Sequence, residues 1–235
     1  MTRIPVPGSR LQAHANSPAQ VPWYAMVGLV IGAVLAAWAW LLGGIPPLLQ
    51  AALVLVAWVW ITGALHLDGL ADCGDAWMSG QSGSRFLDIL RDTRCGAGAL
   101  VWVVLILLVK FSALAVLLGF GQWIALVFAP VLARIVAQVA ILRCRYVRSD
   151  GLGAALGTGT DATLTLVVGG GLALALAVIS LPALVNGVIA AALGFALVYL
   201  MLVRRADGFT GDIYGALVEV CETAVLVSLC VMISG

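Results

Sequence analysis

The chain has 235 residues, of which 63% are hydrophobic and only 10% are charged, whereas about 25% of the residues of an average soluble domain are charged. This composition excludes an ordinary soluble protein and indicates an integral membrane protein. The formal net charge of +1 leaves no basic excess for neutralising a phosphate backbone, which argues against nucleic acid as a partner.

Residues 1–22 are polar and contain several prolines, and we expect them to form a polar N-terminal segment and not a signal peptide. From Pro22 onward, about seven apolar runs are long enough to cross the hydrocarbon core. They cover residues 23–43, 47–65, 97–118, 122–142, 163–182, 185–203 and 213–234. The predicted fold is an all-α, polytopic transmembrane helical bundle that forms a single domain over residues 1–235.

The connections between these runs alternate in charge. Three of them are short, uncharged turns of Gly and Pro. Three others, the segments 66–96, 143–162 and 204–212, are rich in arginine and aspartate. All basic residues except Lys110 and Arg134 lie in these segments or in the N-terminal segment, so the positive-inside rule places them in the cytoplasm. Because the acids follow the same partition, we expect an acidic site that faces the cytoplasm.

The segment HLDGLADCGD, residues 66–75, carries Asp68, Asp72 and Asp75 at i, i+4 and i+7. On a helix they fall within an arc of about 60°. Three carboxylates on one face repel one another unless a cation lies among them. Oxygen ligands favour Mg²⁺, with Mn²⁺ as the other candidate, and such ions bridge carboxylates to substrate phosphates. The stripe predicts phosphoryl or nucleotidyl chemistry; the other interpretation is that these acids only cap and solubilise a helix.

Aspartates and arginines also alternate along the next stretch, residues 85–94. Arg91 and Arg94 are predicted to bind phosphate, and Asp92 between them is a candidate metal ligand or catalytic base. A ladder of salt bridges within the segment is the alternative. His66 is a further candidate base or ligand, although a lone histidine at the end of a span is more often structural.

Some ionisable residues fall inside the predicted spans. Lys110 and Arg134 would each cost about 2.5 to 3.5 kcal/mol if they faced lipid, so we expect both to face the interior of the bundle. Arg134 is a candidate to reach the cytoplasmic site, where it would pair with a carboxylate or bind substrate. Glu219 follows Asp212 by seven residues on the same helix face and is expected to have a buried partner.

Four blocks in this order resemble the cobalamin synthase family, the adenosylcobinamide-GDP ribazoletransferases. The blocks are TGALHLDGLADCGD (62–75), LRDTRCGAG (90–98), DGLG (150–153) and ADGFTGD (206–212). The early TRIPVP is similar as well, and the similarity covers nearly the whole chain. The HLDGLAD block is the most specific of these motifs.

The resemblance implies a multi-pass enzyme of the bacterial inner membrane that takes part in nucleotide loop assembly in cobalamin biosynthesis and depends on magnesium. The family transfers phosphocobinamide from adenosylcobinamide-GDP to α-ribazole or its 5′-phosphate and releases GMP. The implied partners are these two substrates and the lipid bilayer, and docking to other enzymes of the pathway is a further expectation.

The resemblance also assigns roles to residues. The three aspartates of the stripe match the family's acidic motif and become the metal ligands, with Asp92 as a further ligand or base and Arg94 as a phosphate-binding residue. Asp207 and Asp212 match the C-terminal motif, so Asp207 is expected to bind substrate and Asp212 to complete the site or orient the ribose hydroxyl. Ala64 departs from the family, which often has a second glycine there.

Two other functions remain open. The spacing of the acids is also similar to that of CDP-alcohol phosphotransferases, which act on lipid alcohols, but their fuller signature DGxxAR requires arginine where Asp72 follows Ala71. A cation transporter subunit would use the acids as a funnel. The uncharged outer turns and the apolar outer halves of the spans argue against a transporter.

Overall fold

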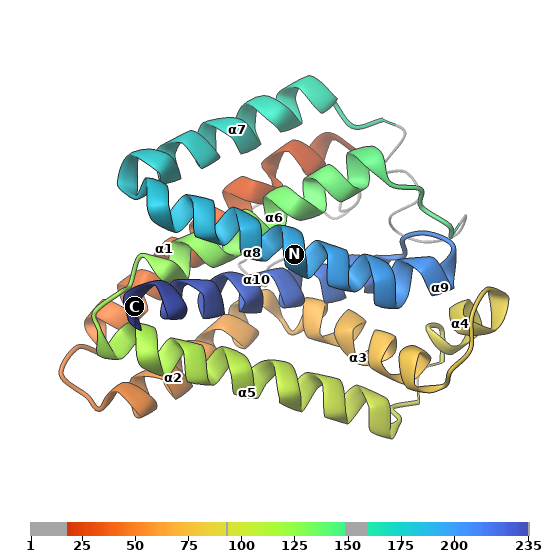
Figure 1. The fold of residues 1–235 in the computed structure, drawn as a ribbon, viewed down its shortest axis with the longest axis horizontal. Helices are drawn as coiled ribbons and strands as arrows, with labels where there is room; N and C mark the ends of the chain where they lie inside the picture. Colours follow the sequence, from red (N-terminus) through yellow and green to blue (C-terminus); the bar gives the residue numbers. More distant parts are fainter. Residues whose placement is uncertain (1–17, 93, 149–158, 235) are drawn as a thin grey trace, which may run out of the picture.

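The computed structural model describes residues 18–92, 94–148 and 159–234, which form an all-α bundle (Figure 1). Its elements are η2 (Pro18–Trp23), α1 (Tyr24–Leu41), α2 (Pro47–Thr62), α3 (Leu65–Met78), α4 (Ser84–Ile89), α5 (Ala97–Gly119), α6 (Ala125–Arg143), α7 (Ala162–Ile179), α8 (Leu181–Val198), η3 (Tyr199–Val203), α9 (Arg204–Ala206) and α10 (Gly211–Ser234). Within the described residues, β pairing is limited to an isolated bridge between Tyr146 and Phe209. The predicted fold class is confirmed.

Within the described part of the chain, six helical stretches are long and apolar enough to cross a membrane. They are Pro18–Leu41, Ala97–Gly119, Ala125–Arg143, Ala162–Ile179, Leu181–Ala206 and Gly211–Ile233. Each corresponds to a predicted span with shifted ends. The remaining predicted span is a bent pair, α2 and α3, whose axes meet at 90°. The residues that the structure describes thus form six such helices, or seven crossings if the bent pair counts as one span.

The bend lies at Gly63 and Ala64, which have φ angles of 65° and 58°. Two successive residues in the left-handed region end α2 and redirect the chain before α3 begins. Ala64 adopts a left-handed backbone conformation that residues other than glycine rarely adopt. The run 47–65, predicted as a single span, is therefore a 16-residue helix that ends at the bend. The second helix, α3, carries the acidic stripe and packs against α5 and α10.

Helix α10 is central and packs against α3, α5, α6 and α8. Glycines bring the surrounding helices close to one another. A Cβ atom on Gly187 of α8 would lie 2.6 Å from a methyl group of Leu132 of α6, and one on Gly28 of α1 would lie 2.5 Å from the carbonyl oxygen of Pro130 of α6. In lipid, small residues of this kind permit the van der Waals contacts that drive helix association.

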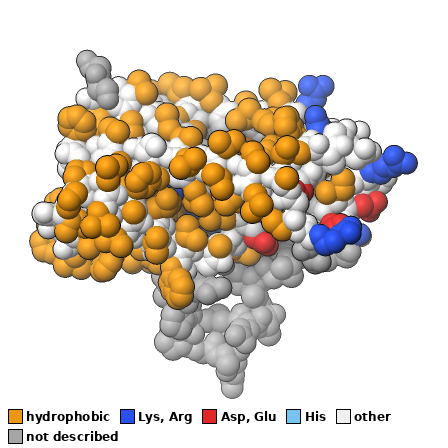
Figure 2. Space-filling model, turned by 90° about the horizontal axis from the view of Figure 1, so that it is seen from below, with side chains coloured by type: hydrophobic (Ala, Val, Ile, Leu, Met, Phe, Trp, Pro, Cys, Tyr) orange, Lys and Arg blue, Asp and Glu red, His pale blue; other side chains and the backbone are white. Residues whose placement is uncertain are grey.

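Charged and apolar side chains are separated along the long axis of the molecule. Figure 2 shows that, on the face it presents, the acidic and basic side chains gather toward one end, while hydrophobic side chains cover the rest. Helices α4 and α9 lie at that end, and the C-terminus lies at the opposite one (Figure 1). Exposed apolar residues such as Trp60 and Val178, 71% and 83% exposed, are suited to contact with lipid. This is the arrangement expected from the alternation of charged and uncharged connections.

Candidate active site at the charged end of the bundle

The acidic stripe lies on α3, as its spacing predicts. Asp68 is exposed, whereas Asp72 and Asp75 are half-buried. The groups that interact electrostatically with Asp72 are Asp212, Asp68, Arg148 and Asp75. The helix that brings the three aspartates onto one face is therefore confirmed. Their carboxylates form a cluster with charges from two other parts of the chain.

A glycine on α3 allows this cluster to form. A Cβ atom on Gly69 would lie 2.7 Å from the carbonyl oxygen of Asp212 and 2.9 Å from its Cα atom, so α3 can approach the start of α10 only with glycine at this position. One turn further along α10, a Cβ atom on Gly215 would lie 3.1 Å from the carbonyl oxygen of His66. The two glycines hold Asp212 beside the stripe, in agreement with its predicted place in the site.

Replacing Gly69 by Ala should therefore force α3 away from α10. We expect the free energy of unfolding to fall by about 1 to 3 kcal/mol, the usual cost of overpacking, and the activity to fall with it because Asp212 leaves the stripe. The matched control is Gly170→Ala in α7, where an added Cβ atom meets nothing within 4 Å. Thermal unfolding of both variants in lipid nanodiscs measures the difference; equal midpoints would contradict the close contact.

Arg148 is the cation of the cluster, and the sequence pattern indicated only an arginine-rich connection around it. Its Nη1 atom donates to Oδ2 of Asp212 at 2.9 Å, and the two side chains are 14% and 22% exposed. Within the described residues, Nε and Nη2 of Arg148 are buried and have no hydrogen-bond acceptor. A guanidinium group with unpartnered N–H groups on two of its nitrogen atoms is suited to the oxygens of a phosphate group.

Asp75 is engaged by the N-terminus of α5. Its Oδ2 atom accepts a hydrogen bond from the backbone N–H of Gly96 at 2.7 Å, and Oδ1 accepts one from the backbone N–H of Ala99 at 2.9 Å. The N-cap residue of α5 makes no side-chain capping bond. Asp75, which lies on α3, caps α5 in its place. Among the three predicted metal ligands, Asp68 and Asp72 accept no such bond from the backbone of the described residues.

The variant Asp75→Ala tests which role the carboxylate has. As a cap, its loss should cost about 0.5 to 2 kcal/mol of stability and leave the Mg²⁺ concentration for half-maximal activity unchanged. The matched control is Asp161→Ala, because Asp161 caps α7 through the backbone N–H of Leu164 at 2.9 Å. A large rise in the Mg²⁺ requirement with Asp75→Ala alone would show that Asp75 is a metal ligand instead.

Asp92 and Arg94 pair with each other between α4 and α5. Arg94 donates to Asp92 through Nε and Nη2, with the shortest bond at 2.6 Å, and its side chain is 88% exposed. These bonds, aided by the backbone N–H of Arg94, lower the pKa of Asp92 to about 2, which makes it a weak base. The geometry matches the salt-bridge alternative. Participation of Asp92, Arg94 and the exposed Arg91 in the site stays a prediction.

A buried network of charges lies deeper in the bundle. Nζ of Lys110 lies 2.6 Å from Oε2 of Glu219 and 2.7 Å from Oε2 of Glu222, and Nη1 of Arg134 lies 2.7 Å from Oε1 of Glu222. All four side chains are buried. The interior orientation predicted for Lys110 and Arg134, and the buried partner predicted for Glu219, are confirmed.

His66 lies beside this network and not in the cluster at the acidic stripe. It is 5% exposed, and Arg134 and Glu222 are among its electrostatic neighbours. Arg134 is fully buried and also donates to the carbonyl oxygen of Pro130. A substrate phosphate at the charged end would have to enter the packed interior to reach either side chain. These positions favour structural roles for His66 and Arg134 over the catalytic and phosphate-binding roles predicted for them.

Asp207 lies in a left-handed turn after α9, with a φ angle of 59°. It is exposed and lines a pocket with the ends of α6 and η3. Its predicted contribution to substrate binding therefore concerns a pocket that the aspartates of the stripe do not line.

The donor set at the stripe suits a magnesium ion that arrives with its substrate. Among the side chains of residues 18–92, 94–148 and 159–234, no three His, Cys, Asp or Glu groups come together to form a complete metal site. Mg²⁺ does not need one, because it is commonly held by one or two carboxylates, several waters and substrate phosphates. Asp68 and Asp72 would supply the carboxylates for such an ion, and Arg148 would supply N–H groups for the phosphate.

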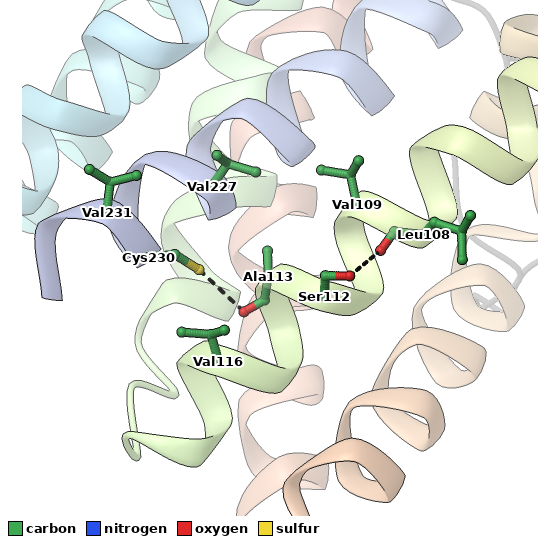
Figure 3. Close-up of a pocket in the computed structure, with 8 residues that line it drawn as sticks. All are labelled: Leu108, Val109, Ser112, Ala113, Val116, Val227, Cys230 and Val231. Carbon is green, nitrogen blue, oxygen red and sulfur yellow. Dashed lines mark hydrogen bonds between the residues drawn. The ribbon is translucent and has the colours of Figure 1, made fainter. Parts of the chain in front are cut away.

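A further pocket, between α5 and α10, is apolar (Figure 3). It has a volume of about 340 Å³, and none of its lining residues is acidic or basic. The polar groups drawn there are satisfied locally, because the hydroxyl of Ser112 donates to the carbonyl oxygen of Leu108 and the thiol of Cys230 to that of Ala113. The pocket does not offer the groups that phosphate chemistry needs.

A multi-pass bundle with clustered carboxylates and an arginine at its charged end is typical of a membrane-embedded transferase for phosphate-containing substrates. Residues 1–230 of the chain match the family model of cobalamin-5-phosphate synthase. The chain belongs to this family, which confirms the resemblance seen in the sequence motifs, and it is an enzyme.

Curated relatives agree with the family model. The chain is 46% identical to an adenosylcobinamide-GDP ribazoletransferase of Pseudomonas aeruginosa (strain UCBPP-PA14) over 97% of this chain and 94% of the relative. It is 43% identical to the protein of that name from Stutzerimonas stutzeri (strain A1501), over 99% and 95% of the two chains. No solved structure gives a significant match.

Proposed function

We propose that the protein transfers phosphocobinamide from adenosylcobinamide-GDP to α-ribazole or its 5′-phosphate in the last steps of cobalamin biosynthesis and releases GMP. The observation that carries this proposal is the packing of the acidic stripe of α3 against Asp212 in a chain of the cobalamin-5-phosphate synthase family. The relatives that bear the name of this activity match over nearly their full length.

The donor is a diphosphate, and its charge requires cationic partners. The unpartnered N–H groups of Arg148 bind diphosphate oxygens. Asp68 and Asp72 would hold Mg²⁺, or Mn²⁺ in its place, and this ion supplies charge neutralisation at the diphosphate and for the leaving GMP.

The acceptor hydroxyl attacks phosphorus in line with the departing GMP oxygen. A bond forms between the hydroxyl oxygen and phosphorus, the bond from phosphorus to the GMP oxygen breaks, and the hydroxyl proton has to be removed. Asp212 orients this hydroxyl or accepts its proton. Its own carboxylate is positioned by Arg148 at 2.9 Å and by the start of α10.

The site is proposed to face the cytoplasm from a bacterial inner membrane. The arginines of the charged end support this orientation through the positive-inside rule. Docking of other enzymes of the pathway to the same end would bring them close to the site.

The alternative functions are disfavoured. A lipid-alcohol phosphotransferase lacks support from the family match. A cation transporter needs a continuous polar path, but the described charges within the bundle are paired with one another, as Lys110 is with Glu219 and Glu222.

GMP release tests the proposal. The purified chain in lipid nanodiscs would receive adenosylcobinamide-GDP and α-ribazole 5′-phosphate, with Mg²⁺ or with EDTA. We expect release that depends on both substrates and on the metal. A folded protein that releases no GMP would overturn the proposal, and transfer to lipid alcohols and cation flux would be measured next.

A further inference from the structure

A polar pocket lies at the charged end, where α6, η3 and α9 end. Its volume is about 470 Å³, and the residues that line it include Arg143, Arg145, Arg204 and Asp207. Within the described ranges, none of the three arginines forms an ion pair. Three guanidinium groups and one carboxylate leave a net positive charge, which matches a phosphate monoester of about −1.5 to −2 near neutral pH.

The backbone beside this pocket is held by a short parallel bridge. The N–H of Val147 donates to the carbonyl oxygen of Phe209 at 3.0 Å, and the N–H of Phe209 donates to that of Arg145 at 2.9 Å. The bridge fastens the arginine-bearing connection after α6 to the segment before α10. Arg145 is therefore presented from an anchored backbone, although its side chain is exposed.

The same extended segment separates the pocket from the acidic stripe. Side chains alternate along an extended chain, and here Arg145 lines the pocket, whereas Arg148 pairs with Asp212. Tyr146, on the same side as Arg148, stacks on Tyr214 with ring centroids 6.3 Å apart. Three extended residues cover about 10 Å, so the pocket and the carboxylates are neighbouring parts of one surface.

One wall of the pocket is aromatic. Tyr199 is 42% exposed and lines the pocket. Its ring stacks on that of Phe195 with centroids 6.0 Å apart and planes at 24°. An exposed ring that is supported by a second ring is suited to stacking with a nucleobase.

We propose that this pocket binds the 5′-phosphate of the acceptor nucleotide, with Arg145 and Arg204 on the phosphate and Tyr199 beside the base. The inference rests on the proposed function for the identity of the nucleotide, α-ribazole 5′-phosphate. The chemistry recognised is a phosphate group, and at the edge of the membrane an anionic lipid headgroup is the other source of that group.

Binding of the acceptor alone tests the pocket without turnover. The full chain in phosphatidylcholine nanodiscs would be titrated with α-ribazole 5′-phosphate and with α-ribazole, without donor or Mg²⁺. We expect the Kd for the phosphorylated acceptor to rise about tenfold in Arg145→Gln and in Arg204→Gln, the order expected when a charged hydrogen bond is lost. The Kd for α-ribazole should not change. The matched control is Arg85→Gln, because the side chain of Arg85 is exposed on α4.

The conservative variant Arg145→Lys keeps the charge and loses the planar fork, so its Kd should lie between those of the wild type and Arg145→Gln. This order separates phosphate recognition from a general loss of folding. Phosphate-selective binding without any GMP release would reject the proposed function and leave the phosphate site standing.

A second set of nanodiscs distinguishes the two sources. If a lipid headgroup occupies the pocket, phosphatidylglycerol should raise the unfolding temperature of the wild type but not of Arg145→Gln, and the two acceptors should bind equally well. If the acceptor occupies it, binding should be phosphate-selective in neutral lipid. Equal acceptor affinities and equal lipid responses in the wild type and both pocket variants would overturn the proposal.

Discussion

The variant Asp72→Asn is expected to lose GMP release by about a hundredfold or more, the order seen when one preorganised group that stabilises transition-state charge is removed. Asp72 is half-buried at the centre of the stripe and interacts with Asp212, Asp68 and Arg148. The substitution keeps the shape of the side chain and removes the negative charge that would hold Mg²⁺ and balance Arg148. Initial rates of GMP release at saturating substrate measure the effect.

Asp88→Asn provides the control, because Asp88 is exposed on α4 and should leave the rate unchanged. Both variants should unfold at nearly the same temperature. A wild-type rate in Asp72→Asn would reject the stripe as the catalytic centre. A rate that recovers at high Mg²⁺ concentration would identify Asp72 as a metal ligand more specifically than the loss of activity alone.

Replacing Glu222 by Gln should be the most destabilising single change in the buried network. Glu222 accepts from Lys110 at 2.7 Å and from Arg134 at 2.7 Å, so its neutralisation leaves two buried cations with one carboxylate, Glu219. Breaking a buried pair of this kind costs about 3 to 5 kcal/mol. Thermal unfolding in nanodiscs should show a clear fall in the midpoint.

Glu219→Gln is the matched comparison. Among the described residues, Glu219 forms an ion pair with Lys110 alone, and Lys110 keeps Glu222 in that variant, so we expect a smaller fall in stability than for Glu222→Gln. Equal losses in the two variants, or a larger loss for Glu219→Gln, would show that Glu222 is not the shared anion of the network.

The network also explains how the interior supports the site. Lys110 of α5 contacts the ring of Trp58 of α2 at 4.8 Å from its centroid, and its two glutamates come from α10. Arg134 adds α6. Four helices are thereby joined below the level at which α10 presents Asp212 to the stripe.

Several features of the protein followed from the sequence alone because they depend on neighbouring residues. The apolar runs had to lie in lipid, and the i, i+4, i+7 spacing of Asp68, Asp72 and Asp75 had to share one face if the segment was helical. The order of the four sequence motifs also identified the protein family. Even the orientation of Lys110 and Arg134 followed from the cost of a charge in lipid.

The tertiary structure decided which of these residues meet, because contacts between distant segments leave no local pattern. The sequence alone predicts only that Gly69 weakens its helix, whereas the structure shows that it permits the close contact with Asp212. Asp75 is indistinguishable from its neighbours on the stripe until the backbone N–H groups of residues 96 and 99 reach it. Arg148 was one arginine among several until its ion pair with Asp212 placed it at the site. Composition and periodicity thus determined the membrane fold and the acidic face, while packing between helices decided which charges form the cluster at the stripe, which one caps a helix and which lie in the interior.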